Sequence, residues 1–287
     1  MLFLKKKLTK SKLIKNDMSE LKILGYINLP EKKIRPEEYR NFLENKMSDI
    51  GREVNEEFDY ELLAADASIL MTGHPDSDKD LKFVDDLENN WAREQYKSVA
   101  QWREAKEKNP STITEMTVTL LLHHLLGKRF IVARAAAYDD YKNHVDNVII
   151  DKETGAVVCG FDEVLGHEGD DGGEKKKDKI NKILDHGGAS LKYGATIEDG
   201  KIKTKELRNI PTFFLSLSKE ELNALLVDLK NSNEISAKEK EVALKMVNSL
   251  DDQYLDLANK NYHPELKANL LAFSDSLVAL KEELNKN

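Results

Sequence analysis

The spacing of apolar residues along the chain changes twice, from a helical period to a strand period and back. Residues 36–110 carry apolar side chains at helical spacing, and Pro36 stands where proline is favoured at a helix start. Short β-branched runs separated by turn residues follow, and after Ser218 the helical spacing returns. The pattern predicts an α/β protein with helical additions at both ends.

The first part of the pattern predicts two long helices, at residues 36–54 and 81–109, with the second closed by Pro110. Between them, residues 72–80 are rich in helix-breaking residues. A third helix is predicted to begin near Thr112, which forms a T-x-x-E capping box with Glu115.

The middle of the chain predicts strands, one lysine-rich helix and a small hairpin. Turns are predicted at Lys152–Gly155 and at Asp199–Gly200, because glycine tolerates the backbone angles of tight hairpins. The predicted strands occupy residues 130–138, 145–151, 156–164 and 210–217, and the lysine-rich helix residues 174–186. The order is helix, three strands, helix, hairpin insertion and strand.

This pattern divides the chain into four parts. They are a basic tail at residues 1–17, a mainly helical region at 18–110, an α/β core at 111–217 and a helical region at 218–287. Ser218 with Glu221 and Ser236 with Glu239 form capping boxes in the last region. Its apolar helix faces predict packing against the core or against a second copy, and in the second case the C-terminal helices would form a homo-oligomer.

Composition narrows the class of protein. The chain has 287 residues, of which 40% are hydrophobic, and no apolar run is long enough to span a bilayer. The N-terminus lacks the apolar stretch and cleavage site of a secretory signal. Cys159 is the one cysteine, which excludes an internal disulfide and a cysteine-based zinc cluster. These features predict a cytoplasmic protein with no membrane partner.

The net charge of −8 argues against broad, nonspecific binding of nucleic acid, because phosphate contact needs basic surface. Two local runs are nevertheless basic. Residues 5–15 carry six lysines, and residues 174–182 carry five. We interpret the first run as part of a solvated, disordered tail. The second run is compatible with a phosphate-binding track, although a solvated helix face is the commoner use of such a run.

Two carboxylates stand on neighbouring predicted strands. Asp146 opens one strand and Asp162 lies near the end of the next, and a short hairpin can set them opposite each other. Glu115 shares a helix face with apolar residues and points toward whatever that helix covers. Buried acids are costly unless they bind a cation or reach solvent, and converging carboxylates suit Mg²⁺ or Mn²⁺.

These residues and their order resemble the PD-(D/E)XK nuclease superfamily over residues 111–217. Glu115 matches the helix glutamate of that family, Asp146 its first-motif aspartate and Asp162 the acid of its (D/E)XK triplet. The element order also resembles the family's αβββαβ core with a central mixed sheet. The resemblance implies a metal-dependent phosphodiesterase acting on DNA, with Mg²⁺ or Mn²⁺ held by the three acids.

The sequence departs from the family pattern at Val164, which stands where the triplet has a lysine that orients and activates the attacking water. In some members this lysine has moved to the following helix. Here Lys176 and Lys177 extend the apolar stripe of that helix toward the sheet and could supply the ammonium group. If neither does, the protein is a catalytically inactive relative that binds a partner or serves as a scaffold.

Each acid also has a structural explanation. Glu115 could act only as the reciprocal partner of a capping box. Asp146 could begin a strand at the solvent edge, and Asp162 could accept hydrogen bonds from the next loop. Their joint order and spacing therefore carry the hypothesis.

Several polar residues surround this stretch. Asp139 and Asp140 could be further metal ligands or could cap a turn, and Arg134 is expected to pair with one of them. His144 neighbours Asp146, although a lone histidine is more often structural.

Overall fold

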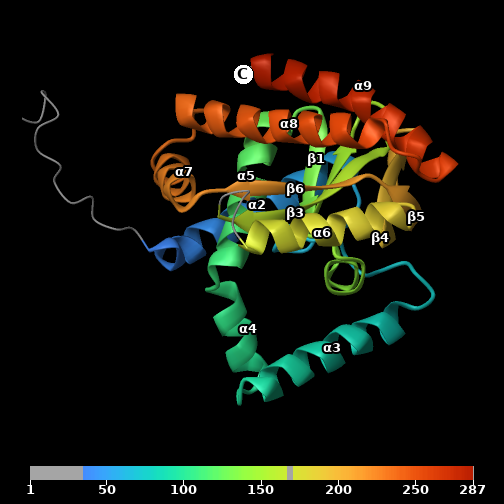
Figure 1. Cartoon of the computed structure of the whole chain (residues 1–287). Helices are drawn as coiled ribbons and strands as arrows, with labels where there is room; N and C mark the ends of the chain where they lie inside the picture. The colour runs from blue at the N-terminus through green and yellow to red at the C-terminus, as the bar shows by residue number, and fades with distance from the viewer. Residues whose placement is uncertain (1–34, 167–170, 287) are drawn as a thin grey trace, which may run out of the picture. The chain divides into compact units, whose positions relative to one another are not determined.

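The computed structural model describes residues 35–166 and 171–286. The basic tail predicted at residues 1–17 lies outside them. Figure 1 shows the arrangement of the helices and strands. In chain order the elements are η1 (Pro36–Tyr39), α2 (Arg40–Phe58), α3 (Ser77–Glu94), α4 (Val99–Glu107), α5 (Pro110–Leu126), β1 (Phe130–Arg134), η2 (Asp139–Asn143), β2 (Asn147–Asp151), β3 (Val157–Leu165), α6 (Asp171–Asp185), β4 (Ala189–Glu198), β5 (Lys201–Ile210), β6 (Thr212–Leu217), α7 (Lys219–Asn231), α8 (Ala237–Ala258) and α9 (Pro264–Lys286).

A mixed sheet with strand order β1-β2-β3-β6 lies at the centre of the fold. Strands β1, β2 and β3 pair antiparallel, whereas β6 runs parallel to β3, with Asp162 beside Phe214. Strands β4 and β5 form a separate two-stranded ribbon that turns at Asp199 and Gly200, both with positive φ. The predicted α/β class, the hairpin insertion and the strand order along the chain are thus confirmed.

Helices α5 and α6 approach the sheet from opposite faces. The Thr119 hydroxyl of α5 donates to the Asn147 side chain on β2, which in turn donates to Glu163 on β3. The preceding β3 residue, Asp162, pairs with Lys176 of α6. Because successive strand residues point to opposite faces, these contacts place α5 over one face and α6 over the other.

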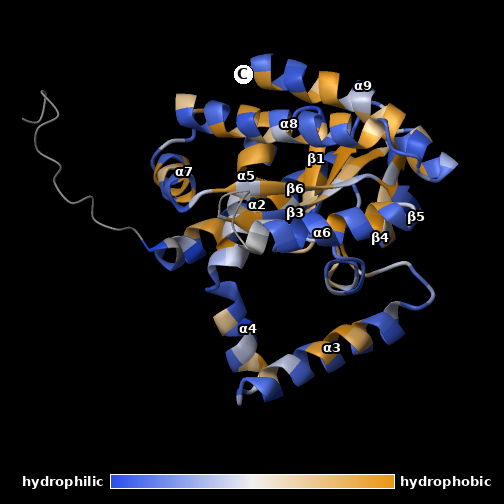
Figure 2. Ribbon diagram, viewed as in Figure 1, coloured by the Kyte–Doolittle hydropathy of each residue, from blue (hydrophilic) through white to orange (hydrophobic). Residues whose placement is uncertain are grey.

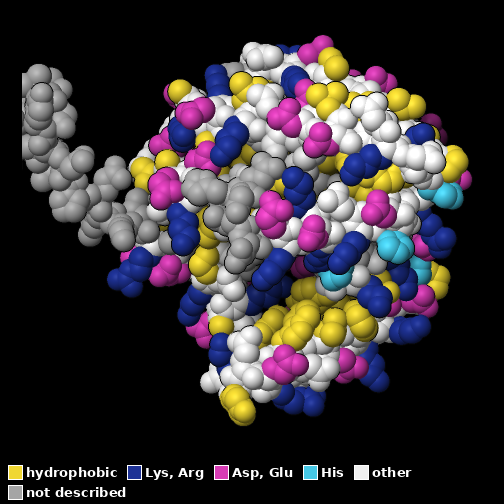
Figure 3. Space-filling model, viewed as in Figure 1, with side chains coloured by type: hydrophobic (Ala, Val, Ile, Leu, Met, Phe, Trp, Pro, Cys, Tyr) yellow, Lys and Arg dark blue, Asp and Glu magenta, His cyan; other side chains and the backbone are white. Residues whose placement is uncertain are grey.

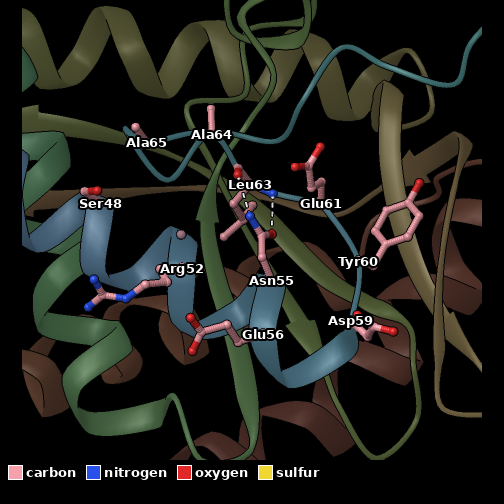
Figure 4. Close-up of a pocket in the computed structure, with 11 residues that line it drawn as sticks. Ser48, Arg52, Asn55, Glu56, Asp59, Tyr60, Glu61, Leu63, Ala64 and Ala65 are labelled. Carbon is pink, nitrogen blue, oxygen red and sulfur yellow. Dashed lines mark hydrogen bonds between the residues drawn. The ribbon is translucent and has the colours of Figure 1, made fainter.

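The loop after α2 is fastened to that helix by Asn55. The Asn55 side-chain oxygen accepts the backbone N–H groups of Leu62 and Leu63, and its amide donates to the Leu63 carbonyl. At Gly51 the helix comes so close to the Ala64 carbonyl that a Cβ would lie 2.6 Å from its oxygen. A pocket of about 510 Å³ lies between the helix and this loop (Figure 4).

Two helix predictions are wrong in detail. The helix expected at residues 81–109 is broken into α3 and α4, because Tyr96 adopts a left-handed backbone and Ser98 starts a new helix with a capping box to Gln101. The third helix begins at Pro110 with Asn109 as its cap, not near Thr112. The side chain of Glu115 is therefore not engaged in a capping box.

The C-terminal helices α7, α8 and α9 lie together on one side of the sheet (Figure 1). Their buried faces contain Leu226, Met246 and Phe273, and the Phe273 ring stacks on Phe213 of β6 at 4.5 Å. The capping box at Ser218 is confirmed. These faces pack against the core of the same chain, so self-association through this region stays a prediction.

Apolar residues concentrate in the sheet and on the inward faces of the surrounding helices, whereas α3 and α6 alternate orange and blue along their lengths (Figure 2). The buried apolar side chains form one cluster that reaches from Leu43 on α2 to Leu284 on α9. The regions expected at 18–110, 111–217 and 218–287 thus share one core within the described residues. Across those residues, none of the helices combines the length and hydrophobicity that a bilayer crossing requires.

The turn between β2 and β3 provides a test of the fold. Gly155 has φ +71° and accepts a hydrogen bond from the backbone N–H of Ile197, and a Cβ there would collide with the Ile197 carbonyl. Replacing Gly155 with alanine is expected to lower the free energy of unfolding by about 3 kcal/mol, from the left-handed backbone and the collision together. Gly200 has φ +72° with nothing within 4 Å of a built Cβ, so Gly200→Ala should cost only about 1 kcal/mol. Urea unfolding of both variants measures the difference. Equal losses in the free energy of unfolding would show that the collision at Gly155 contributes nothing.

Candidate metal centre

Three carboxylates converge where β2 begins and β3 ends. Asp146 directly precedes β2, and the antiparallel register that pairs Asn147 with Phe161 sets Asp146 opposite Asp162. Asp146, Asp162 and Glu163 each offer a ligand oxygen, and these atoms lie within 4.8 Å of one another. Asp146 and Asp162 are thus brought together as the sequence predicts.

Lys176 is the lysine that reaches this group. Its ammonium, on the first turns of α6, forms an ion pair with Asp162 and stands 3.6 Å from the nearer carboxylate oxygen of Asp146. Lys177 is exposed and lines a different pocket, between α6, β6 and α8. Val164 is buried and apolar. Of the two lysines proposed from the sequence, the structure therefore brings Lys176 to the carboxylates.

Glu163 is a site residue that sequence reasoning missed. Strand alternation assigns it to the face opposite Asp162, and nothing in the local spacing links it to Asp146. In the structure Glu163 is 3% exposed, and one carboxylate oxygen accepts from Asn147. A useful signal was present, since a second acid within a buried strand needs a partner.

Glu115 lies beside the cluster and is not a member of the three-carboxylate group. Its carboxylate is 3.4 Å from Arg134 and accepts a bond from the Ser111 hydroxyl. Arg134 also pairs with Asp66 at 3.2 Å. The expected pairing of Arg134 with Asp139 or Asp140 is wrong, because the loop that carries Asp66 runs alongside the end of β1.

The two acids of the π-helical turn η2 have different roles. Asp139 is buried and accepts the backbone N–H groups of Lys192 and Tyr193, so it secures β4 and does not point into the cluster. Asp140 faces the carboxylates. Burial raises the pKa of Asp140 to about 7, and the charge of Asp146 adds to the rise.

Burial and mutual repulsion disfavour the charged forms of the carboxylates in this cluster. Burial raises the pKa of Asp146 to about 7, and its contact with Asp162 contributes further. Burial also holds the pKa of Glu163 well above its ordinary value, and the charges of Asp146 and Glu115 act in the same direction. Lys176 offsets part of this negative charge. Burial and mutual repulsion thus favour the protonated forms of Asp146 and Glu163, an effect that another cation at the site would oppose.

The arrangement fits a hard divalent cation. Within the described part of the chain, Asp162 Oδ2 and Glu163 Oε2 are buried without a hydrogen-bond partner. Buried carboxylate oxygens are costly when unpaired, and Mg²⁺ and Mn²⁺ are bound through oxygen ligands. Asp146, Asp162 and Glu163 are thus the residues that could hold such an ion.

A second acidic group, His74 with Asp76 and Asp80, offers ligand atoms at similar spacing. There the Lys192 ammonium already bridges Asp76 and Asp80 at 2.9 and 2.6 Å, and the Tyr193 hydroxyl donates to Asp80. These groups neutralise one another, so this cluster serves to join α3 to β4.

The two histidines of α5 are structural. His123 is buried near Glu53, and burial lowers its pKa. His124 contacts the fully buried Glu239 at 2.8 Å and thereby links α5 to α8. The capping box predicted at Ser236 is therefore only half formed. The Ser236 side chain accepts the backbone N–H of Glu239, but the Glu239 carboxylate contacts His124 and does not return to Ser236.

No family model, curated protein or solved structure matches this chain. Its function is therefore inferred from the fold and from the geometry of the carboxylate cluster.

Proposed function

We propose that the protein is a metal-dependent phosphodiesterase. More particularly, we propose a nuclease of the PD-(D/E)XK type that acts on DNA with Mg²⁺ or Mn²⁺. The observation that carries the proposal is the convergence of Asp146, Asp162 and the Lys176 ammonium from two neighbouring strands and the following helix.

The topology supports the same class. Helix α5, strands β1 to β3, helix α6 and strand β6 follow the order αβββαβ, with the β4–β5 ribbon inserted before the last strand. The first three strands are antiparallel and the last is parallel to the third, as the mixed sheet of that superfamily requires. Fold alone does not establish function, so the site residues carry the greater weight.

Each residue has a defined role in this proposal. Asp146 and Asp162 would hold the ion, with Glu163 as the third oxygen ligand, and Glu115 would support the site through Arg134. A bound divalent cation would polarise a phosphate oxygen and offset the negative charge that develops on the phosphodiester. Lys176 would position the attacking water, the role that Val164 cannot fill because it has no charge and no donor.

Cleavage of a labelled DNA oligonucleotide with Mn²⁺, Mg²⁺ or EDTA tests the proposal. We expect cleavage with either ion and none with EDTA, and Asp162→Asn should reduce the rate by at least about a hundredfold because it removes a charged ligand. Asp178→Asn, an exposed aspartate on α6, is the matched control and should cleave normally. Cleavage that persists in EDTA, or in Asp162→Asn, would contradict the metal mechanism.

A second function, that of a non-catalytic binding or scaffold protein, is favoured by Val164 and by the net charge of −8. It predicts that the carboxylates bind Mn²⁺ while no oligonucleotide is cleaved under any condition. The same assay, combined with calorimetric titration of Mn²⁺, separates the two functions.

A further inference from the structure

Three of the lysines of α6, with the histidine that follows the helix, form a stripe along one helix face. Lys175, Lys179, Lys182 and His186 follow one another at intervals of four, three and four residues, the spacing that places side chains on one helix face. Lys176, which contacts the carboxylates, lies beside the start of this stripe. At 100° per residue, Glu174 and Asp185 lie about 90–110° from the middle of the stripe, whereas Asp178 lies about 70° from it and borders Lys182. The stripe itself is therefore basic along its length, with Asp178 at one edge.

Three members of the stripe, Lys179, Lys182 and His186, line a pocket. This pocket has a volume of about 360 Å³ and lies between α6, the end of η2 and the start of β4. Its basic lining consists of Lys142, His144, Lys179, Lys182 and His186. Among the described residues that line it, none is acidic. Because the whole protein is acidic, an acid-free pocket lined by three lysines and two histidines is a local exception.

Two residues that line the pocket are near neighbours of the carboxylate cluster along the chain. His144 stands two residues before Asp146, and Lys179 lies one turn after Lys176 on α6. The backbone of His144 is left-handed, with φ 61°, at the end of the π-helical turn. Lys142, His144, Lys179 and Lys182 line the same pocket, so these basic side chains lie close together. In Figure 3, lysine, arginine and histidine side chains lie along α6 together with acidic ones, above a hollow between α6 and α3.

We propose that the face of α6 bearing Lys179, Lys182 and His186, together with Lys142 and His144, binds the sugar–phosphate backbone of a nucleic acid on one side of the bond to be cleaved. This inference rests on the proposed function, since it assigns the path by which that substrate crosses the site. From Lys176 to His186, the residue that follows α6, ten steps of 1.5 Å cover about 15 Å, roughly four base-pair steps at 3.4 Å each. The contacts are to phosphates and carry no base specificity.

The test measures binding separately from cleavage. In an Asp162→Asn background, Lys179→Ala/Lys182→Ala is compared with Lys219→Ala/Lys240→Ala, which removes two exposed lysines from α7 and α8. Fluorescence anisotropy with a labelled 20-mer, single- or double-stranded, gives the affinity as a function of salt. Removing two phosphate contacts should reduce the slope of log K against log salt by roughly 1.4–1.8 and weaken binding about tenfold or more at 0.1 M salt. The control pair should change affinity less than about twofold.

The outcomes separate this inference from the proposed function. Loss of binding confined to the α6 variant supports the inference even if the parent protein cleaves nothing, in which case only the nuclease assignment fails. Metal-dependent cleavage with unchanged affinity and salt slope in the α6 variant overturns the inference alone. Inorganic phosphate that competes as well as an unlabelled 20-mer would show a small-anion pocket and would also overturn it. Melting curves of all variants confirm that they are folded.

Discussion

Replacing Lys176 with methionine is expected to reduce metal-dependent cleavage by at least about a hundredfold while leaving Mn²⁺ binding intact or tighter. The rate falls because positioning and proton transfer by a side chain typically contribute a factor of about 10² to 10⁴. Binding is retained because the oxygen ligands Asp146 and Asp162 remain. It can even tighten, since the ammonium now paired with Asp162 competes with the ion for the same carboxylate.

The adjacent lysine provides a matched control. Lys177 has the same chemistry and nearly the same sequence position but is exposed and lines a pocket against α8. Lys177→Met should therefore cleave at close to the parental rate. Steady-state kinetics and Mn²⁺ titration are needed for both variants. If Lys177→Met lost cleavage and Lys176→Met kept it, the assignment of the water-positioning lysine would be wrong.

The position of Lys176 could be predicted because it depends on two regular periods. Strand alternation and a tight hairpin set Asp146 opposite Asp162, and helical spacing put Lys176 on the inward stripe one turn before Ile180. Such relations are fixed within one element or between two elements joined by a short turn. Sequence reasoning captures them because few alternative geometries exist.

One of the missed relations depends on contacts between distant segments. Arg134 turns toward Glu115 and Asp66 because the loop after α2 runs beside β1, and nothing in the spacing near Arg134 shows that loop. Glu163 lies on a neighbouring strand and was missed for a different reason: alternation assigns it to the face opposite Asp162, although its carboxylate oxygen lies within 4.8 Å of those of Asp146 and Asp162 near the start of β2. Tertiary packing decides the position of Arg134, on which the local pattern is silent.

The break between α3 and α4 was missed for another reason. Tyr96 has a left-handed backbone without being glycine or asparagine, and Ser98 caps a new helix although it sits inside a helical apolar pattern. The break directs Trp102 of α4 back toward Trp91 of α3, and the two rings lie 5.6 Å apart. Burial of these rings outweighs the local cost of the left-handed residue, which is about 1–2 kcal/mol.

The electrostatic strain of the cluster predicts an unusual stability profile for Asp146→Asn. A carboxyl whose pKa is raised by folding binds its proton more tightly in the folded than in the unfolded state. Its contribution to stability is therefore complete below about pH 4 and is lost as pH rises toward 7, the pKa of Asp146 in the folded protein. The amide of the variant would carry no charge to bury, and its side-chain oxygen can still accept the Glu163 backbone N–H that Asp146 accepts.

At pH 8 with EDTA, Asp146→Asn should consequently be more stable than the parent protein. Since one pKa unit is worth about 1.4 kcal/mol, the gain is about 2–4 kcal/mol, or a rise in Tm of roughly 5–10 °C. At pH 4 the two proteins should melt at nearly the same temperature. Asp178→Asn removes an exposed aspartate of α6 and should show no such difference at either pH.

Adding Mn²⁺ should reverse the order of the two proteins. An ion that binds only the folded state adds about 2.7 kcal/mol when its concentration is a hundred times the Kd, and the parent protein should gain this stabilisation because the ion neutralises Asp146, Asp162 and Glu163 together. The variant lacks one charged ligand and should gain little. Melting curves at pH 4 and 8, with EDTA and with Mn²⁺, measure all of these effects. If Mn²⁺ does not raise the Tm of the parent protein, or raises the Tm of the variant by the same amount, the carboxylates converge without forming a metal site. A variant less stable than the parent at pH 8 in EDTA would show instead that Lys176 already satisfies the charge of Asp146.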